Sequence, residues 1–261
     1  MKKYTGLLGY PVSHSISPQI HNNWYNEENL DFEYLTFPIA PEDLGSFIDT
    51  VKNNTITLPT EGQLKGFSVT IPHKESIIPF LNKIDQTAIE IGAVNTVIVN
   101  KNFELQGHNT DWKGWVNSLS ETQKSDIKTT EICLIGAGGA AQAIAYALKH
   151  LNISNVTVYN RTLAKAEQLA QKYNFKSAKT LKDLTSTTNK ILINATPIGL
   201  KNKDPLPLPS NLIQSANTVY DLLYNQNSLS DFCLQHNVPY YNGMSMLIEQ
   251  AKLQHKLFTT N

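Results

Sequence analysis

The clearest pattern of hydrophobic and polar positions lies between residues 131 and 223, where short β-branched runs alternate with segments of helical periodicity. Four runs predict strands: EICLIG, NVTVYN, KILINA and TVYDLL. Two segments, 140–151 and 163–173, have apolar residues about every 3.6 positions and predict helices. Because strands that alternate with helices build a parallel sheet with helices on its faces, this stretch predicts such a sheet.

The first 110 residues predict mixed α and β structure with a less regular rhythm. Strands are expected near 4–9, 32–37 and 67–70, and a two-strand pattern over 96–107 has its turn at Asn100 to Asn102. Ser17 before Pro18 has the form of a helix N-cap, which predicts a helix from there through residue 28. Ser15 and Ser17 are then expected in the loop that precedes this helix.

The last segment, residues 244–258, is amphipathic at helical spacing and predicts a helix that needs a partner surface. The proline-rich stretch KNKDPLPLPS at 201–210 predicts a polar surface loop. The apolar face of the final helix is expected to run through Met246, Leu247, Ala251, Leu253 and Leu257.

Composition narrows the class of protein. The chain has 261 residues, 41% of them hydrophobic, which predicts two domains with real cores. Its 22 basic residues balance 22 acidic ones, so a small-molecule partner is expected rather than nucleic acid or a membrane. The N-terminus does not resemble a signal peptide, and no long apolar run follows. Cys133 and Cys233 lack metal or redox spacing, which predicts buried free thiols, no metal and a cytoplasmic location.

The sequence GAGGAAQ at 136–142 follows a predicted strand and opens a predicted helix. Its spacing matches the G-x-G-x-x-G/A pattern of dinucleotide-binding folds. Glycine lets the backbone approach a pyrophosphate, which then meets unpaired N–H groups at the helix start. The cofactor-binding residues expected in this loop are Gly136, Ala137, Gly138, Gly139, Ala140 and Ala141.

The next strand indicates which dinucleotide is bound. NAD sites usually place an acid at its end, to hold the ribose 2′-hydroxyl. Here Asn160, Arg161 and Thr162 stand there instead, which favours the 2′-phosphate of NADP. Lys165 is a second cation one turn further on, equally explained as a solvated helix residue. Arg161 is the one arginine among the 22 basic residues.

Several motifs in order along nearly the whole chain resemble the shikimate/quinate dehydrogenase family. They are GYPVSHSISPQIHN at 9–22, GFSVTIPHKE at 66–75, GAVNT at 92–96, GHNTDWKG at 107–114, the glycine loop, NRT, NATPIG at 194–199, YDLLYN at 220–225 and GMSMLIEQA at 243–251. The resemblance implies NADP-dependent reduction of 3-dehydroshikimate to shikimate, in the biosynthesis of chorismate and the aromatic amino acids.

The resemblance also implies the site residues. Lys74 and Asp111 are the catalytic pair, and an ammonium that donates a proton to a developing alkoxide suits hydride addition to a ketone. Considered alone, Lys74 is a surface lysine and Asp111 a helix N-cap. The implied substrate-binding residues are Ser15, Ser17, Thr70, Asn95, Asp111, Tyr224 and Gln250, and the further cofactor-binding residues are Thr196, Leu222 and Gly243.

Four positions depart from the family pattern. Ser68 stands where asparagine is common, which puts substrate preference or affinity in doubt. Pro197 replaces a common serine and Ser245 a glycine, and both are expected to tune the cofactor site or the domain junction. Trp112 is bulkier than the frequent glycine and is expected to alter the mouth of the cleft. His14 and His21 are expected to be structural, since nothing pairs them with a nucleophile or a metal.

The fold expected from the resemblance is α/β, with a mixed α/β substrate domain, a Rossmann-type dinucleotide domain, and a C-terminal helix that returns to the substrate domain. The expected domains are 1–110 with 243–261, and 111–242, with the site in the cleft between them. Two alternatives stay open: an NAD-dependent quinate/shikimate dehydrogenase, and a nicotinamide-binding sensor without chemistry. A homodimer is one assembly that the sequence allows.

Overall fold

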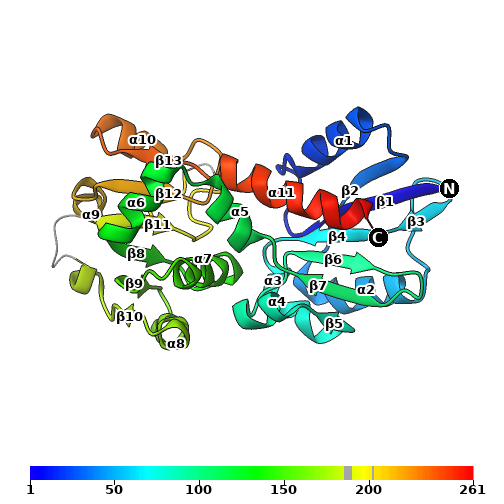
Figure 1. Ribbon diagram of the computed structural model, residues 1–261, viewed down its shortest axis with the longest axis horizontal. Coiled ribbons are helices and arrows are strands. Elements are labelled where there is room, and N and C mark those ends of the chain that lie inside the picture. Colours follow the sequence, from blue (N-terminus) through cyan, green and yellow to red (C-terminus); the bar gives the residue numbers. More distant parts are fainter. Residues whose placement is uncertain (185–189, 202, 261) are drawn as a thin grey trace. The chain divides into compact units, whose positions relative to one another are not determined.

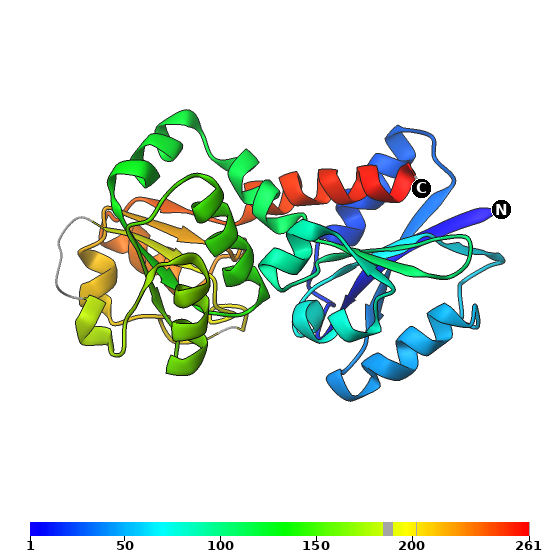
Figure 2. The same cartoon turned by 60° about the horizontal axis from the view of Figure 1, so that its bottom comes forward.

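A computed structural model describes residues 1–184, 190–201 and 203–260 of the chain (Figures 1 and 2). The chain forms two compact units. The first unit comprises Met1–Asp111 and Gln250–Asn261, and the inserted unit comprises Trp112–Glu249. The sequence places the boundaries after residues 110 and 242, whereas these compact units divide after Asp111 and before Gln250.

The inserted unit contains a parallel sheet of six strands among the described residues, in the order β10-β9-β8-β11-β12-β13. All four strands that the sequence predicts are present. The strands are β8 (Glu131–Ile135), β9 (Val156–Tyr159), β10 (Lys176–Ser177), β11 (Lys190–Asn194), β12 (Thr218–Asp221) and β13 (Tyr240–Tyr241). The chain runs from β8 outward to β10, then returns to β11 and runs outward the other way, so the strand order reverses between β8 and β11.

Helices cover both faces of this sheet, as the alternation of elements predicts. The two predicted helices are confirmed as α7 and α8, the first of them one residue earlier than expected. On one face lie α5 (Asp111–Ser118), α6 (Glu121–Thr129), α7 (Gly139–His150) and α8 (Leu163–Tyr173). On the other lie η3 (Leu181–Leu184), α9 (Ser210–Gln214) and α10 (Ser228–Gln235).

The first unit contains a mixed sheet with the order β2-β1-β4-β6-β7-β5, and β3 pairs with β1 off this path. The pairs β4–β6 and β6–β7 are antiparallel and the others parallel, and the predicted two-strand pattern is the β6–β7 hairpin. The strands are β1 (Lys2–Gly9), β2 (Phe32–Pro38), β3 (Gly62–Leu64), β4 (Gly66–Val69), β5 (Lys83–Ile84), β6 (Thr96–Val99) and β7 (Leu105–His108).

Two apolar clusters hold helices against opposite faces of this sheet, as Figure 2 shows for α1 and α2. α1 (Ser17–Glu27) and the end of α11 (Met244–Thr259) share a cluster that contains Tyr25 and Phe258. The other cluster joins α2 (Leu44–Lys52) and α4 (Gln86–Ile91) to the sheet. The short elements are η1 (Pro41–Asp43), α3 (His73–Ser76) and η2 (Ile78–Phe80).

Two local predictions are wrong. Ser17 does not cap α1, because the N-cap is Ile16 without a side-chain hydrogen bond, and Ser17 and Pro18 already lie in the helix. The stretch 201–210 is not wholly a surface loop, since Leu208 is buried in the core under α9; Asn202 lies outside the described residues. Both errors have one origin, because a short local sequence pattern contains no information on the tertiary contacts that compete with it.

The final helix is present, and its buried face only partly coincides with the one expected: Ala251 is buried, and Met246 and Leu257 pack against apolar clusters. Leu253 and Leu257 are only half-buried. The buried residues are Gln250, Ala251, Gln254, His255 and Phe258, at spacings of three and four. The apolar pattern missed this face because glutamine and histidine are buried when hydrogen bonds satisfy them, and periodicity counts them as polar.

Cys133 and Cys233 are buried free thiols, as predicted. Burial raises the pKa of each thiol to about 11, so both stay protonated near neutral pH. In the described part of the chain, no helix is long and apolar enough to cross a membrane.

Candidate active site

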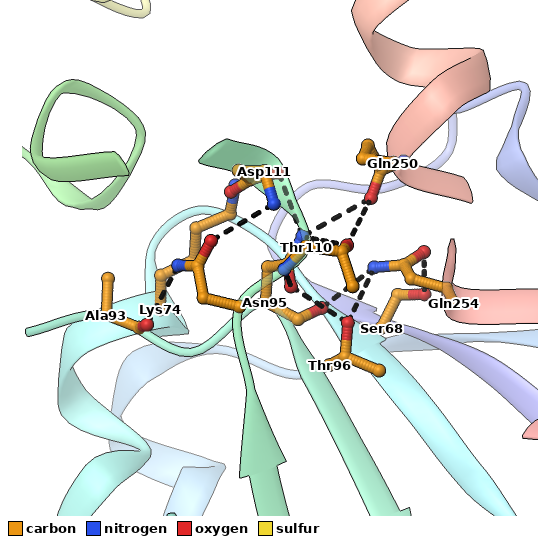
Figure 3. A network of polar contacts seen from close by, with 10 residues as sticks. Ser68, Lys74, Ala93, Asn95, Thr96, Thr110, Asp111, Gln250 and Gln254 are labelled. Atoms are coloured by element: carbon orange, nitrogen blue, oxygen red, sulfur yellow. Dashed lines mark hydrogen bonds and ion pairs between the residues drawn. The ribbon is translucent and has the colours of Figure 1, made fainter. Parts of the chain in front are cut away.

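Lys74 and Asp111 meet in the first unit, on segments that follow the carboxyl ends of β4 and β7 (Figure 3). Lys74 lies in the single-turn helix α3, and its Nζ is 2.6 Å from Asp111 Oδ2. Asp111 begins α5 directly after the β7 strand and the turn that follows it. The backbone N–H of Asp111 donates to Asn109 Oδ1, whose amide in turn donates to the carbonyl of Ala93. The turn therefore fixes the carboxylate that faces the ammonium.

Asn95 connects this ion pair to the rest of the unit. Its amide nitrogen donates to Asp111 Oδ1 at 2.8 Å and to Thr110 Oγ1 at 2.9 Å, and Gln250 Oε1 lies 3.3 Å away. Its amide oxygen accepts from the N–H of Thr110 and from Thr96 Oγ1, both at 2.8 Å. Asn95 is buried, so each of these bonds forms where water competes little.

A second layer of polar residues lies behind Asn95. Ser68, Thr96 and Gln254 are buried and hydrogen-bonded to one another or to Asn95. Ser68 was noted in the sequence only as a departure from the family pattern, and Thr96, Thr110 and Gln254 were not predicted. Thr96 and Thr110 lie next to predicted site residues, which was the one signal available for them. Gln254 lies one helical turn after Gln250, a spacing that places both on one face of α11.

The other predicted substrate residues are placed as follows. Ser15 and Ser17 face each other at the start of α1, with their hydroxyl oxygens 3.2 Å apart. Thr70 follows β4, and its methyl group lies so close to Gly9 that an added Cβ there would be 2.4 Å away. Tyr224 follows β12 in the inserted unit and is half-buried. Within the described part of the first unit, no hydrogen bond or ion pair joins Ser15, Ser17 or Thr70 to the side chains of Lys74 and Asp111.

The glycine loop occupies the point where the strand order of the inserted unit reverses. Gly136 follows β8 with φ +111°, and an added Cβ would lie 3.0 Å from the carbonyl oxygen of Ala195. Gly138 is the N-cap of α7. The first N–H groups of a helix have no partner within it, so the start of α7 suits an anion such as a pyrophosphate. Parallel α/β sheets bind dinucleotides at this kind of switch point.

The end of β9 presents neutral and cationic groups. Arg161, Thr162 and Lys165 are exposed, and the Asn160 amide donates to the carbonyl of Thr162. An acid is absent from this strand end, so nothing there repels a 2′-phosphate. The residues present therefore fit NADP.

The last three predicted cofactor residues follow β11 and β12. Thr196 donates its hydroxyl to Asn194 Oδ1 at 2.7 Å, which holds the turn after β11. Gly243 packs directly on Leu222, because an added Cβ would lie 2.2 Å from the Leu222 carbonyl oxygen. Leu222 and Gly243, with Ser245, line a cavity of about 380 Å³ in the inserted unit.

The remaining departures have local explanations. The Trp112 ring makes edge contacts with Tyr146 and His150 of α7, at 5.2 and 4.9 Å between ring centroids, so its bulk ties α5 to α7. Pro197 is exposed in the turn after β11.

Within the described residues, no group of three or more His, Cys, Asp or Glu side chains is placed to hold a metal ion.

An amine–carboxylate pair among neutral hydrogen-bonding groups, in a chain with a dinucleotide fold, defines a nicotinamide-dependent oxidoreductase. Two family models match the chain: the shikimate dehydrogenase substrate binding domain over residues 7–97, and shikimate / quinate 5-dehydrogenase over residues 118–199. A curated relative, shikimate dehydrogenase (NADP(+)) from Caldanaerobacter subterraneus, is 37% identical, over 98% of this chain and 91% of the relative. The chain belongs to the shikimate dehydrogenase family.

Solved structures agree with this assignment. The crystal structure of shikimate dehydrogenase from Aquifex aeolicus has a TM-score of 0.86 and 33% identity, covering all of this chain and 93% of its own. Shikimate 5-dehydrogenase from Thermus thermophilus, solved with NADP(H) and shikimate, has a TM-score of 0.82 and 28% identity, covering all of this chain and 94% of its own. The predicted fold class is confirmed.

Proposed function

We propose that this chain catalyses the reversible, NADP-dependent reduction of 3-dehydroshikimate to shikimate, in the biosynthesis of chorismate and the aromatic amino acids. The observation that carries the proposal is the Lys74–Asp111 ion pair with Asn95 and Gln250 beside it, in a chain whose relatives bear that activity in their names. The enzyme is an oxidoreductase that acts on a CH–OH group.

Lys74 and Asp111 handle the proton of the reacting hydroxyl. In the oxidation of shikimate, the carbinol C–H bond breaks as hydride leaves, the O–H bond breaks, and a C=O bond forms. The hydroxyl proton passes to the Lys74 nitrogen in its neutral amine form, which becomes the ammonium that donates to Asp111 Oδ2 at 2.6 Å. In the reverse direction the same pair returns the proton to the developing alkoxide, whose charge the ammonium stabilises.

The rest of the first unit's site orients the substrate ring. Thr70, Asn95, Asp111 and Gln250 supply neutral and anionic partners for the ring hydroxyls. Ser15 and Ser17, with Tyr224, hold the carboxylate through hydroxyl donors, which suits a chain whose one arginine lies at the end of β9. The Ser15 hydroxyl donates to Ser17 Oγ at 3.2 Å, so the Ser17 proton is available to the carboxylate at once, and the Ser15 proton becomes available when its hydroxyl turns from Ser17 to the ligand.

The inserted unit holds the cofactor. Gly136, Ala137, Gly138, Gly139, Ala140 and Ala141 surround the pyrophosphate at the start of α7. Asn160, Arg161, Thr162 and Lys165 hold the 2′-phosphate, and Thr196, Leu222 and Gly243 contact the remainder. NADP⁺, when bound, accepts the hydride from the carbinol carbon.

A comparison of four substrate–cofactor pairs tests the proposal: shikimate or quinate with NADP⁺ or NAD⁺, followed by absorbance of the reduced nicotinamide. The expected result is that shikimate with NADP⁺ has the highest kcat/KM. A preference for quinate with NAD⁺ would instead identify the catabolic alternative. Binding of NADP⁺ without turnover of any pair would identify a sensor.

Three further predictions complete the proposal. Residues 1–110 with 243–261 bind the substrate and residues 111–242 bind NADP, the enzyme works in the cytoplasm, and it forms a homodimer. Cell fractionation checks the location, and light scattering at micromolar concentration checks the mass in solution. A monomer mass at all concentrations would contradict the dimer.

A further inference from the structure

The Ser68 hydroxyl both accepts and donates a hydrogen bond inside the first unit. Its hydroxyl oxygen accepts from the Tyr34 hydroxyl at 2.7 Å. Its single proton goes to Gln254 Oε1 at 2.8 Å, the bond drawn between these two residues in Figure 3. Burial raises the pKa of Tyr34, which keeps that phenol a donor. Ser68 therefore has no proton to give to a substrate hydroxyl, although it occupies the position where the family commonly has an asparagine amide.

Gln254 brings an amide group next to Ser68 from helix α11. Gln254 projects from α11 and is buried, and its nitrogen donates to the carbonyl oxygen of Asn95 at 3.0 Å and to Thr96 Oγ1 at 3.1 Å. These two bonds use both protons of the amide, while its oxygen accepts from Ser68. All four bonds of the Ser68–Gln254 pair thus lie within the network.

The network continues in one direction to the ion pair. Because Thr96 Oγ1 accepts from Gln254, its own proton is free to go to Asn95 Oδ1 at 2.8 Å. With its oxygen held by that bond and by the bond from the Thr110 N–H, Asn95 turns its nitrogen to Asp111 Oδ1. Hydrogen bonds therefore run from Tyr34 through Ser68, Gln254, Thr96 and Asn95 to Asp111, each donor facing the next acceptor.

We propose that Gln254 is a positioning residue, which supplies from α11 the amide that position 68 lacks and so fixes the orientation of Asn95 and Asp111. The assignment of Asn95 to the substrate rests on the proposed function. We call Ser68 and Gln254 an exchange pair, because the space between them holds one amide group that either position could supply. The short serine at 68 leaves that space to the amide of Gln254. Their polar atoms are 2.8 Å apart, so an asparagine at 68 would collide with Gln254.

A double-mutant cycle tests the exchange, using Ser68→Asn, Gln254→Ala and the double variant. Ser68→Asn overfills the space, and Gln254→Ala removes both donors to Asn95 and Thr96. Each single variant is expected to lower the thermal unfolding midpoint by several degrees. Each should also raise the Kd for shikimate about tenfold, which corresponds to about 1.4 kcal/mol. The KM for NADP⁺ should stay the same in all variants.

In the double variant, Asn at position 68 supplies the one amide that the space between positions 68 and 254 can hold. Its shikimate Kd should return to within about threefold of wild type, and its unfolding midpoint should recover with it. Additive losses in the double variant, with no recovery in either measurement, would overturn the exchange.

A matched control separates positioning from mere stability. Tyr25→Phe removes a buried phenol whose hydroxyl lies 2.8 Å from Thr5 Oγ1, in the same unit and outside the network. It should lower the unfolding midpoint and leave the shikimate Kd unchanged, whereas Tyr34→Phe should raise that Kd. If Gln254→Ala behaves like Tyr25→Phe, the positioning role is wrong.

Failure of the proposed function would look different. A wild-type protein that neither binds nor oxidises shikimate would refute that function, and with it the positioning of a shikimate ligand. The unfolding midpoint of the double variant is measured without substrate. Its recovery would therefore still decide whether an amide at position 68 can replace the amide at position 254.

Discussion

Lys74 and Asp111 form an ion pair whose side chains are 15% and 5% exposed. Little water screens such a pair, and removal of one partner leaves the other charge poorly compensated. The pair therefore constrains the geometry of the site. Substitutions at either residue are therefore expected to slow the chemical step and also to lower stability, while Asn95 and Asn109 still hold the turn.

Asp111→Asn is expected to lower kcat/KM for shikimate by about 10²- to 10⁴-fold, since an amide cannot share the proton with Lys74. Steady-state kinetics measures this loss. The control is Asp85→Asn, which alters another carboxylate of the same unit, whose Oδ2 lies 2.7 Å from His108 Nδ1, and keeps the N-cap oxygen of α4. It should change kcat/KM by less than about twofold. Equal losses in the two variants would argue against a special role for Asp111.

Arg161→Ala is expected to raise the KM for NADP⁺ about 10- to 100-fold, because a charge-assisted bond to the 2′-phosphate contributes about 1.5–3 kcal/mol. The kcat at saturating NADP⁺ and the KM for NAD⁺ should not change. Lys165→Ala should have a smaller effect in the same direction. An equal rise in the KM for both cofactors after Arg161→Ala would show that the guanidinium does not read the phosphate.

Residue by residue, the sequence predicted those site positions that lie in short contiguous motifs, such as Lys74, Asn95 and Asp111. It did not predict Gln254 or the engagement of Ser68. These two residues are 186 positions apart and meet through one side-chain hydrogen bond. A buried polar contact of this kind leaves no periodic pattern, because its partners are specified by the tertiary fold.

At the scale of elements, the alternation of strands and helices from β8 to β12 was predictable because both faces of a parallel sheet are covered and its strands read as continuous apolar runs. The buried face of α11 was not, since it contains Gln250, Gln254 and His255. The two-residue strands β5, β10 and β13 were also missed, because so short a strand contains too few positions for a period of two.

The contact between the start of α11 and the end of β12 allows an element-scale prediction. Gly243→Ala should lower the thermal unfolding midpoint by several degrees and weaken NADP⁺ binding, because the added Cβ would lie 2.2 Å from a backbone oxygen. The control is Gly45→Ala in α2, where the nearest atom to an added Cβ is 3.6 Å away. It should stabilise by about 0.5–1 kcal/mol. A stabilised Gly243→Ala would contradict the close packing.

At the scale of the whole molecule, the stability is expected to depend on acidity through His21. Burial, and then the neighbouring His255, lower the pKa of His21 to about 3 from an ordinary value of 6.5. Between these two values the unfolded chain binds a proton that the folded chain does not. The free energy of unfolding should therefore fall as pH drops below 6.5, by up to about 1.4 kcal/mol per pH unit, until pH 3.

Urea unfolding at pH 7.5 and pH 5.0 measures this dependence, with His21→Phe as the test and exposed His14→Asn as the control. Wild type and His14→Asn should lose about 2 kcal/mol more between the two conditions than His21→Phe does. The buried carboxyl of Asp221, whose pKa burial raises, has the opposite sign, and it cancels in this comparison because all three proteins retain it. Equal losses in all three proteins would rule out His21 as the cause.

The most direct measurement is the absorbance of NADPH while purified protein is offered 3-dehydroshikimate, with wild type and Lys74→Ala in parallel. Absorbance is expected to fall rapidly with wild type. With Lys74→Ala it should fall at least about 10²-fold more slowly, although shikimate and NADP⁺ still bind. Undiminished turnover by Lys74→Ala would contradict the catalytic role of Lys74, and no turnover by wild type with NADPH would contradict the proposed activity.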